Sequence, residues 1–395
     1  MVESAAAIAL KSMRVLLVSS SSGSHGGGEL FLISLGQCLS ELGHQPILWA
    51  ADHPRMDELC ERFRSFGEVH RRPYRNTYDR KFRTIAAAAD LSTASKAAAD
   101  WRSLKPDVVH LNKQNLEDAM DLVWAARFAR LPAIASIHVT QDARYLRARF
   151  GALRDALTRS VLCRFPGKLV AVGRSRLTDL RAFLGQEDSV VMVENGVPIP
   201  PEGVLRTLRA SVRERLGVRP DQLFGLGVGR LVKQKRPLVF LDIAKKIVSR
   251  EPSAVFYWVG DGLLRADWNR VIAENKLEDH VKLAGWCQSV LEFYAAADFF
   301  LHTAEFEGLP LALLEALAAG LPVVVTPNLT RDLDFLDNDN ALSADLEKTD
   351  WIDALLDSDD RAKRSKFTRA LATDRFSVER MTIEYVALYE RARAR

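Results

Sequence analysis

EFEGLPLALLEALAAGLPVVVT, residues 305–326, has the pattern of a loop, a buried helix and a buried strand in succession. Pro310 fits the first turn of a helix, where no amide donor is needed, and Gly320 fits the position just past the helix end, where a left-handed backbone costs least. We therefore predict a helix over about residues 311–319. Apolar residues occupy all its sides, so we expect protein to enclose it, and Glu315 is its only charged residue.

Two carboxylates near the start of this helix suggest a ligand site. Glu315 could merely complement the helix dipole or form an ion pair with a structural arginine, because a lone buried carboxylate needs a partner. Glu307, however, stands eight positions earlier, in a Gly-containing loop at the same helix end. The free amides of a helix N-terminus, approached through Gly308 and Leu309, suit phosphate, whereas carboxylates accept hydrogen bonds from hydroxyls. Phosphate and polyol together indicate a sugar nucleotide.

The segment from Glu307 to Thr326 also resembles a family motif. Its two glutamates, Gly-Leu-Pro and Gly-Leu-Pro-Val-Val-Val stand in the order of the Glu, seven residues, Glu motif of the family 4 retaining glycosyltransferases (group 1). The resemblance implies the GT-B fold, an α/β architecture of two facing Rossmann-like domains with a cleft between them. It also implies that Glu307 holds the hydroxyls of the donor sugar and that Glu315 holds those of the ribose.

Length and composition fit a globular protein of two domains. A chain of 395 residues is too long for one ordinary core, and it is 48% hydrophobic and 27% charged. No apolar run approaches the roughly 20 residues of a membrane helix, and the Ala-rich N-terminus is too short for a signal peptide, so we expect a cytoplasmic protein. Four scattered cysteines indicate neither a disulfide framework nor a zinc site: Cys38, Cys60, Cys163 and Cys287.

Basic residues are concentrated in the first half of the chain. Residues 1–200 hold 27 basic and 21 acidic residues, a net charge of +6, which leaves −2 for the remainder. Nucleic-acid binding is disfavoured, because the second half is slightly acidic and the basic stretches lack interleaved aromatic residues.

The chain begins with a mononucleotide-binding pattern. A buried strand at residues 14–20 leads through a small-residue loop into a helix at 29–42, and a strand follows at 46–50. The glycines at 26–28 match neither the dinucleotide fingerprint nor a P-loop, and a plain tight turn would also explain them. By resemblance, Gly27 and Gly28 belong to the family's first loop and let the donor diphosphate and the acceptor approach the backbone.

The rest of the first half continues as alternating strands and helices. His138 ends a predicted strand, at the edge where open α/β sheets place ligands, although most single histidines are structural. By resemblance it contacts the donor sugar. The expected segments are a basic irregular stretch at 62–83, an Ala-rich helical region up to 101, strands at 107–112, 133–138 and 169–172, a basic helical stretch at 144–168, and a linker at 190–201.

The second half restarts the alternation and ends in an amphipathic helix. Strands are expected at 224–228, 254–259, 281–283 and 299–302, with a helix at 237–249. We expect an acceptor-side domain over 1–198, completed by the C-terminal helix 376–395, and a nucleotide-sugar-binding domain over 199–375.

Arg230 and Lys235 form a second candidate site. They follow the carboxyl end of a predicted strand, where an arginine fork and a lysine charge could both reach a diphosphate. A solvated basic loop is the alternative interpretation. Their spacing matches the donor-diphosphate pair of the family.

Two Asp-x-Asp sequences, Asp332/Asp334 and Asp337/Asp339, raise the question of a metal. They lie in the polar run NLTRDLDFLDNDN, which is typical of a loop and not of a strand edge that directs two carboxylates at one ion. We therefore expect no metal and no cofactor.

The sequence thus predicts a retaining, metal-independent glycosyltransferase with a UDP- or GDP-sugar donor. The acceptor would be a glycan, a lipid-linked glycan or a small molecule, as in cell-envelope polysaccharide synthesis. The resemblance gives His138 and Glu307 as catalytic residues. One departure is His302-Thr303, where the family more often has Pro-Ser. A GT-B sugar-nucleotide epimerase and an inert sugar-nucleotide-binding protein are the alternatives.

The basic stretches at 62–83 and 144–181 also suggest peripheral contact with an anionic membrane at its inner face. A few basic residues in register would bind reversibly without an apolar anchor, and Arg71, Arg72 and Arg75 are the first candidates. Solvated arginines spread around the surface are the alternative.

Overall fold

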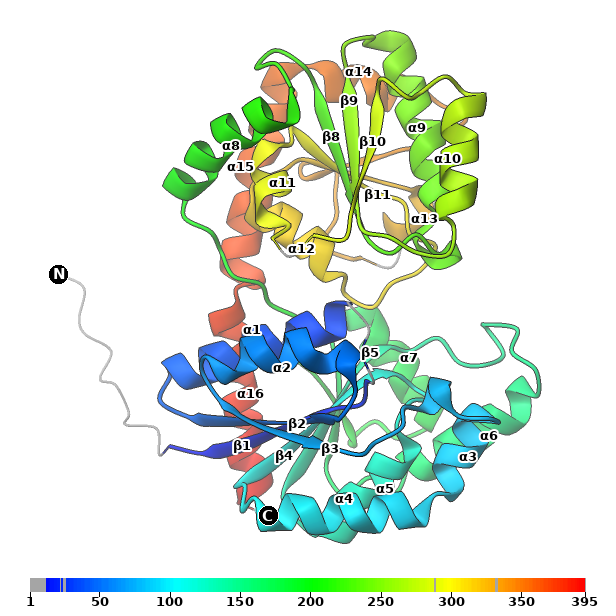
Figure 1. Ribbon diagram of the computed structural model, residues 1–395, viewed down its shortest axis with the longest axis vertical. Coiled ribbons are helices and arrows are strands. Elements are labelled where there is room, and N and C mark those ends of the chain that lie inside the picture. The colour runs from blue at the N-terminus through cyan, green and yellow to red at the C-terminus, as the bar shows by residue number, and fades with distance from the viewer. Residues whose placement is uncertain (1–11, 22, 24–25, 288, 331–332, 395) are drawn as a thin grey trace, which may run out of the picture. The chain divides into compact units, whose positions relative to one another are not determined.

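The structure is a computed structural model that describes residues 12–21, 23, 26–287, 289–330 and 333–394. The chain divides into two compact units (Figure 1). Unit 1 comprises Met1–Glu194 and Met381–Arg395, and unit 2 comprises Asn195–Arg380. Among the described helices, none combines the length and the apolar character needed to cross a bilayer.

Unit 1 is built on a parallel sheet. In its described part seven strands lie in the order β3-β2-β1-β4-β5-β6-β7, and all neighbours pair in parallel. Strand β1 is mostly apolar, as expected where both faces of a sheet are covered, whereas β4 is equally buried but carries His110, Asn112 and Lys113. The strands are β1 (Arg14–Ser19), β2 (Gln45–Ala51), β3 (Glu68–Arg72), β4 (Val108–Asn115), β5 (Ala133–Val139), β6 (Lys168–Ala171) and β7 (Val190–Met192).

Helices flank this sheet, with α1 and α2 on one face and α4 and α5 on the other (Figure 1). The helices are α1 (Gly27–Glu41), α2 (Asp57–Arg64), α3 (Arg83–Ala89), α4 (Leu91–Ser103), α5 (Met120–Ala129), α6 (Gly151–Leu162) and α7 (Arg174–Leu184), with short 3-10 turns η1 (Pro54–Met56) and η2 (Thr77–Asp79).

The C-terminal helix α16 (Val378–Arg393) is bound to unit 1 through a buried histidine. The two ring nitrogens of His110 lie 2.7 Å from Tyr389 Oη and 2.7 Å from Ser136 Oγ, and Tyr385 Oη lies 2.8 Å from the same serine oxygen. Burial lowers the pKa of His110 to about 3, so the ring is neutral. Hydrogen bonds as well as packing therefore fix α16 on β4 and β5.

Unit 2 repeats the plan with a shorter sheet. In its described part six strands lie in the order β10-β9-β8-β11-β12-β13, again all parallel. The elements are α8 (Glu202–Leu216), β8 (Phe224–Val228), η3 (Lys233–Lys235), α9 (Pro237–Arg250), β9 (Val255–Val259), α10 (Arg265–Glu274), β10 (Val281–Gly285), α11 (Leu291–Ala296), β11 (Phe299–His302), α12 (Leu311–Ala318), β12 (Val323–Val325), α13 (Pro327–Thr330), β13 (Ala341–Ser343), α14 (Asp350–Leu356) and α15 (Ser358–Arg375).

The apolar segments were predicted well and the polar ones were not. The helix predicted at 311–319 is α12, and Gly320 beyond it has the expected left-handed φ of +76°. The stretch at 62–83, predicted irregular, instead contains the edge strand β3, whose sequence EVHRR hides its strand character because it is polar. The helix predicted from 144 begins only at Gly151.

The loop prediction for Gly27 and Gly28 was also wrong. Both residues lie in the first turn of α1, and Gly26 precedes the helix with an extended backbone. The helix therefore begins two residues earlier than residue 29, where the first non-glycine residue stands.

Each sheet has one topological switch point, where the strand order reverses. These points lie between β1 and β4 in unit 1 and between β8 and β11 in unit 2. In open α/β sheets, ligands bind beyond the carboxyl ends of the strands at such points. The loops after β8 and β11, and those after β1 and β4, are therefore where a site is expected.

Candidate functional site

The loops that follow β8 and β11 are hydrogen-bonded to each other. The Glu305 amide donates to Gln234 O at 2.8 Å, and Gln234 Nε2 donates to Phe306 O at 3.1 Å. Thr303 Oγ1 donates to Lys235 O at 2.9 Å. The two loops therefore form one continuous surface at the switch point of unit 2.

A buried ion pair joins two of the predicted site residues on this surface. Lys235 Nζ contacts Glu307 Oε1, and the two side chains are only 17% and 8% exposed. His302, the last residue of β11, is buried with its Nε2 3.7 Å from the same glutamate oxygen. The structure thus brings Lys235, Glu307 and His302 together. Lys235 and Glu307 are 72 positions apart in the sequence.

His302 is a neutral neighbour of this ion pair. Burial lowers the pKa of His302 to about 4; the Lys235 charge acts in the same direction and the Glu307 charge opposes it. Its Nε2 has no hydrogen-bond partner among the described residues. The sequence marked this residue only as a departure from the family pattern. Its position at a strand end beside a switch point was the signal that could have identified it.

Arg230 and Lys235 lie on the same loop in different environments. Arg230 is exposed, and its side chain makes no ion pair with any other described residue, as the solvated-loop interpretation expects. Lys235 is partly buried and paired. Arg230 is therefore a solvated cation just after β8, and Lys233 on the same loop is exposed as well.

The start of α12 adjoins the same loop. Gly308 and Leu309 are buried, and Leu309 O accepts a hydrogen bond from Asn195 Nδ2 at 2.9 Å. Pro310 precedes the helix with an extended backbone, and the first turn of any helix leaves its amides without intrahelical acceptors. The arrangement offers backbone donors beside the Lys235–Glu307 pair.

Glu315 has a partner that the sequence did not reveal. The hydroxyl of Tyr294, a buried residue of α11, lies 3.0 Å from Glu315 Oε2 and 2.9 Å from Ala312 O. Burial raises the pKa of Glu315 to about 7, and the hydrogen bond from Tyr294 opposes this shift. The carboxyl group therefore retains its proton to a higher pH than an exposed glutamate does.

In unit 1, His138 and Gly28 are connected through Asn112. Asn112 Nδ2 donates to Gly28 O at 3.0 Å, so its Oδ1 faces His138 Nε2 at 2.6 Å and that nitrogen carries the proton. Burial lowers the pKa of His138 to about 4, and Phe31 packs edge-on against the ring at 4.9 Å. A Cβ on Gly28 would lie 2.1 Å from the end of the Gln114 side chain, so any larger residue here would have to displace that side chain.

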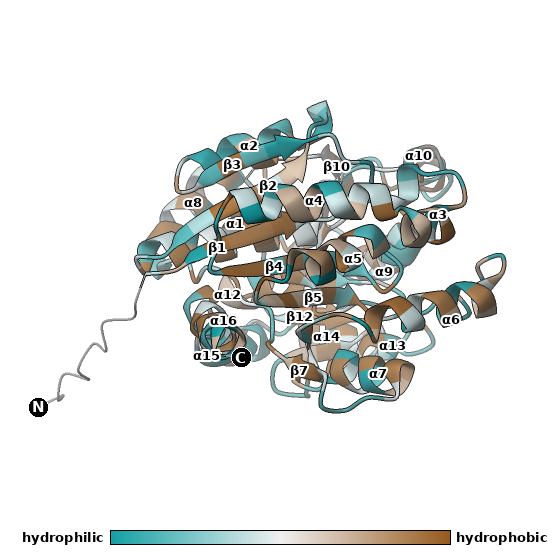
Figure 2. Cartoon of the chain, turned by 90° about the horizontal axis from the view of Figure 1, so that it is seen from below, coloured by the Kyte–Doolittle hydropathy of each residue, from teal (hydrophilic) through white to brown (hydrophobic). Residues whose placement is uncertain are grey.

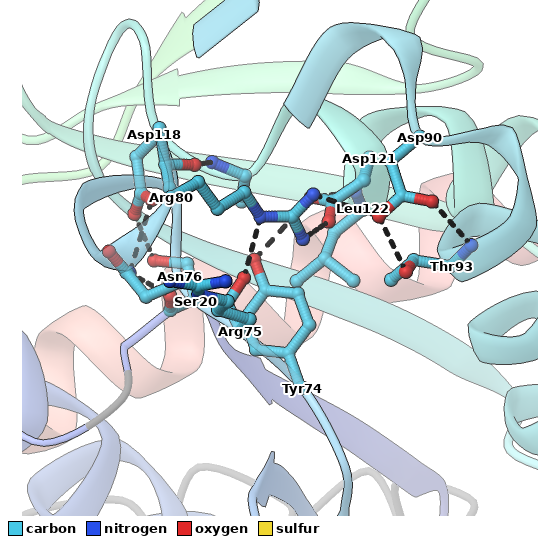
Figure 3. A network of polar contacts seen from close by, with 12 residues as sticks. Ser20, Tyr74, Arg75, Asn76, Arg80, Asp90, Thr93, Asp118, Asp121 and Leu122 are labelled. Carbon is cyan, nitrogen blue, oxygen red and sulfur yellow. Dashed lines mark hydrogen bonds and ion pairs between the residues drawn. The ribbon is translucent and has the colours of Figure 1, made fainter. Parts of the chain in front are cut away.

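A network of buried polar side chains lies beyond the end of β1 (Figure 3). Ser20 Oγ hydrogen-bonds Asp118 Oδ2, and Asn76 Nδ2 donates to Ser20 O at 2.5 Å. All three residues are buried. They fix the segment around Asn76 to the β1 edge and to the residues that lead into α5.

Arginines that the sequence suggested as a free basic surface are ion-paired in the structure. Arg71 contacts Asp52 at 3.1 Å and Asp57 at 2.7 Å, and Arg72 contacts Asp100 at 2.9 Å. Arg80 also lies between two carboxylates, as Figure 3 shows. The prediction that the 62–83 stretch presents a basic surface is therefore wrong for these three residues, because acidic partners from other elements neutralise them.

The described aspartates of the 332–339 region serve local structure. Asp337 Oδ1 accepts the amides of Asp339 at 2.9 Å and Asn340 at 3.2 Å, which closes a turn. Asp334 pairs with Arg375 at 3.4 Å. Asp332 lies outside the described residues.

Sequence profiles match both halves of the chain. The profile described as "Glycosyltransferase Family 4" matches residues 25–199, and the profile described as "Glycosyl transferases group 1" matches residues 225–357. The chain belongs to the group 1 glycosyltransferases. The family predicted from the Glu307–Thr326 motif is thereby confirmed.

The names of two curated relatives of this group 1 glycosyltransferase each include a lipid. UDP-Gal:alpha-D-GlcNAc-diphosphoundecaprenol alpha-1,3-galactosyltransferase of Escherichia coli is 37% identical over 122 residues, 30% of this chain and 32% of the relative. Alpha-monoglucosyldiacylglycerol synthase of Acholeplasma laidlawii is 23% identical over 243 residues, 57% of this chain and 59% of the relative. The chain thus matches about a third to three fifths of the length of these relatives.

A solved structure shares the whole fold. The Anabaena protein HepE, crystallised with UDP and glucose, superposes with a TM-score of 0.75 over 96% of this chain and 99% of its own, at 19% identity. Together with the two parallel-sheet α/β units, this confirms the predicted GT-B fold.

Replacing Glu315 by Gln should change how stability depends on pH. The folded pKa of about 7 exceeds the ordinary value of 4.5, so the folded state holds a proton that the unfolded chain has lost. The free energy of unfolding of the native protein should therefore fall as pH rises from 4.5 through 7, whereas Glu315→Gln lacks this loss. The free energy of unfolding, measured with urea, should increase in the variant relative to the native protein by on the order of 1–3 kcal/mol between pH 5 and pH 8.

The matched control is Glu305→Gln, an exposed glutamate of the neighbouring loop, which should give no pH-dependent difference. A Glu315→Gln variant that is less stable than the native protein at pH 8 would show that the ionised carboxylate stabilises the fold.

Proposed function

We propose that this protein is a retaining glycosyltransferase that moves a sugar from a nucleoside diphosphate sugar to a glycan, lipid-linked or small-molecule acceptor. The observation that carries the proposal is the meeting of Lys235, Glu307 and His302 at the switch point of unit 2, beside the start of α12. Unit 2 would bind the nucleotide sugar and unit 1 would lie on the acceptor side. Membership of group 1 supports this assignment.

The donor is proposed to be a UDP-sugar, with a GDP-sugar as the second choice. HepE was crystallised with UDP and with UDP-glucose, and the Escherichia coli relative is named for UDP-Gal. Glu315 would bind the ribose hydroxyls, and Gly308 and Leu309 would present backbone amides to phosphate. Glu307 would accept hydrogen bonds from the sugar hydroxyls.

Catalysis would depend chiefly on stabilising the leaving diphosphate. Breaking the anomeric bond increases the negative charge on that group, and Arg230 and Lys235 would offset it without a metal ion. Glu307 holds Lys235 in place before the substrate binds, so little reorganisation is needed in the transition state. No residue stands out as a covalent nucleophile, so we infer attack by the acceptor on the face from which the diphosphate leaves.

His138, Gly27 and Gly28 are the unit 1 residues proposed to contact substrate. Asn112 fixes the tautomer and orientation of His138, which leaves Nδ1 unprotonated in the neutral ring. His138 would contact the donor sugar, and the start of α1 would let the substrates approach the backbone.

A lipid-linked acceptor is favoured, because the names of both curated relatives above describe lipid-linked molecules. We therefore propose a cytoplasmic enzyme that works peripherally at the inner face of the membrane, as in cell-envelope polysaccharide synthesis.

Release of nucleoside diphosphate from UDP-sugars should require an acceptor. Incubation with UDP-glucose or UDP-galactose and a lipid extract should give UDP and a new glycolipid, whose anomeric proton coupling reports retention. Conversion of the donor to another sugar nucleotide without acceptor would instead identify an epimerase.

Activity should not depend on a divalent metal. Excess EDTA should leave the turnover rate unchanged, since Arg230 and Lys235 supply the positive charge. Loss of activity in EDTA with rescue by Mn²⁺ would return attention to the aspartates at 332–339.

Arg230→Ala should slow turnover without altering the fold, because the side chain is exposed. A barrier increase of about 2–4 kcal/mol is expected, seen as a fall of roughly 30- to 900-fold in kcat. Lys233→Ala, which removes another exposed cation from the same loop, is the matched control and should keep most of the activity. Equal losses in the two variants, or a change in KM alone, would contradict a transition-state role.

A further inference from the structure

Exposed apolar side chains gather at two adjoining helices of unit 1. Helix α3 packs against α6, and both lie at the same end of unit 1 in Figure 1. Figure 2 shows hydrophobic residues along α6 and at α3. Of fourteen exposed large apolar residues in the described part of the chain, six belong to these helices and the turns before them: Phe82, Ile85, Tyr145, Leu146, Phe150 and Leu153. We name this surface the α3–α6 patch.

Two phenylalanines are held outward at a conformational cost. Phe82 and Phe150 are the residues directly before α3 and α6, with left-handed φ values of +66° and +59°, and they are 74% and 62% exposed. A bulky side chain disfavours this conformation, which asparagine or glycine would adopt more readily. Neither ring gains burial in return. The fold alone therefore gives no reason for phenylalanine at either position.

The patch is also strongly basic. Its exposed cations are Lys81, Arg83, Arg144, Arg147 and Arg149, and no acidic residue occurs in 81–89 or 143–154.

Four of these cations lie over aromatic rings or near a carboxylate, and Arg83 lies 5.6 Å from the Tyr78 ring centroid. Lys81 lies 5.9 Å from the Phe82 ring centroid and Arg149 lies 4.9 Å from that of Phe150. Arg144 is 3.7 Å from the buried Asp155, at the limit of an ion pair.

These cations differ from the other arginines of the same segments. Arg80 and Arg154 are held by carboxylates within unit 1, whereas Arg83, Arg147 and Arg149 make no ion pair with any described residue. The positive charge of the patch is therefore available to an external anion.

We propose that the α3–α6 patch docks this enzyme reversibly on an anionic lipid bilayer. Aromatic and aliphatic side chains would enter the headgroup boundary, and the surrounding cations would contact anionic lipid. This deepens the proposed function, on which it rests for its purpose, because a lipid-linked acceptor is presented at such a surface.

A second copy of the chain is a poorer occupant for the patch. A two-fold interface would place the same five cations opposite one another. The cations of the patch lie within the basic stretches 62–83 and 144–181, from which membrane contact was predicted. The first candidates Arg71 and Arg72 are instead ion-paired, and the apolar side chains of the patch were not predicted.

Co-sedimentation with vesicles tests the proposal. The native protein should bind vesicles of phosphatidylcholine mixed with phosphatidylglycerol, should not bind phosphatidylcholine alone, and should be released by high salt. Phe82→Asn combined with Phe150→Asn should lower the partition coefficient about tenfold or more. The melting temperature of this variant should be equal or higher, because asparagine tolerates the left-handed backbone.

The matched control is Leu263→Asn with Phe367→Asn, which removes two exposed apolar residues from unit 2 and should leave vesicle binding unchanged. Arg147→Ser with Arg149→Ser should weaken binding to the anionic vesicles without changing thermal stability.

Four outcomes would overturn the proposal: no binding of the native protein to anionic vesicles, equal binding by the Phe82/Phe150 variant, preferential binding of the patch to single-stranded RNA, or loss of a dimer in light scattering when the patch is changed. Vesicle binding does not require turnover, so its failure is separate from failure of the transferase assay. A protein that binds the vesicles but has no transferase activity would contradict the proposed function and support the docking role of the α3–α6 patch.

Discussion

The parallel arrangement of the strands is the constraint from which the candidate site follows. In both units every described strand pairs in parallel, so all carboxyl ends meet at one edge of each sheet. Most of the strands are buried and mostly apolar, although β3 is polar and β4 carries buried polar residues. His138, His302 and Arg230 lie at or just after the ends of strands, where polar side chains can reach a ligand. The strand order then selects one crevice in each unit.

The charged groups at this edge of the sheet have different partners in the two units. In unit 1 the polar groups satisfy one another: Asp118 is buried against Ser20, and burial lowers the pKa of Lys113 to about 8 while it donates to the Asp118 carbonyl. In unit 2 the Lys235–Glu307 pair is balanced, and the adjacent Arg230 remains solvated. A closed network suits a structural role, because each polar group already has a partner. A balanced ion pair with exposed cations beside it suits an anionic ligand.

The parts of this structure that depend on local pattern were predictable from sequence. Helix α12 and strands β8 and β11 were placed almost to the residue, since short apolar runs that end at turn or polar residues admit few alternatives. Edge strand β3 was missed because its residues are polar. The roles of Tyr294 and His302 were also missed, because each depends on burial and on a contact from another element. Motif spacing gave Lys235 and Glu307, but not that they form an ion pair.

Arginine shows most clearly what sequence does not determine. The first half of the chain carries a basic excess, yet Arg71 and Arg80 are neutralised by carboxylates that lie elsewhere in unit 1, whereas Arg147 and Arg149 make no ion pair with described residues. Net charge therefore overstates the basic surface and misplaces it. What distinguishes the second group is its setting, on turns with left-handed residues and exposed apolar side chains. A cation on such a turn has no carboxylate partner in the described fold, so its charge can serve a partner outside the chain.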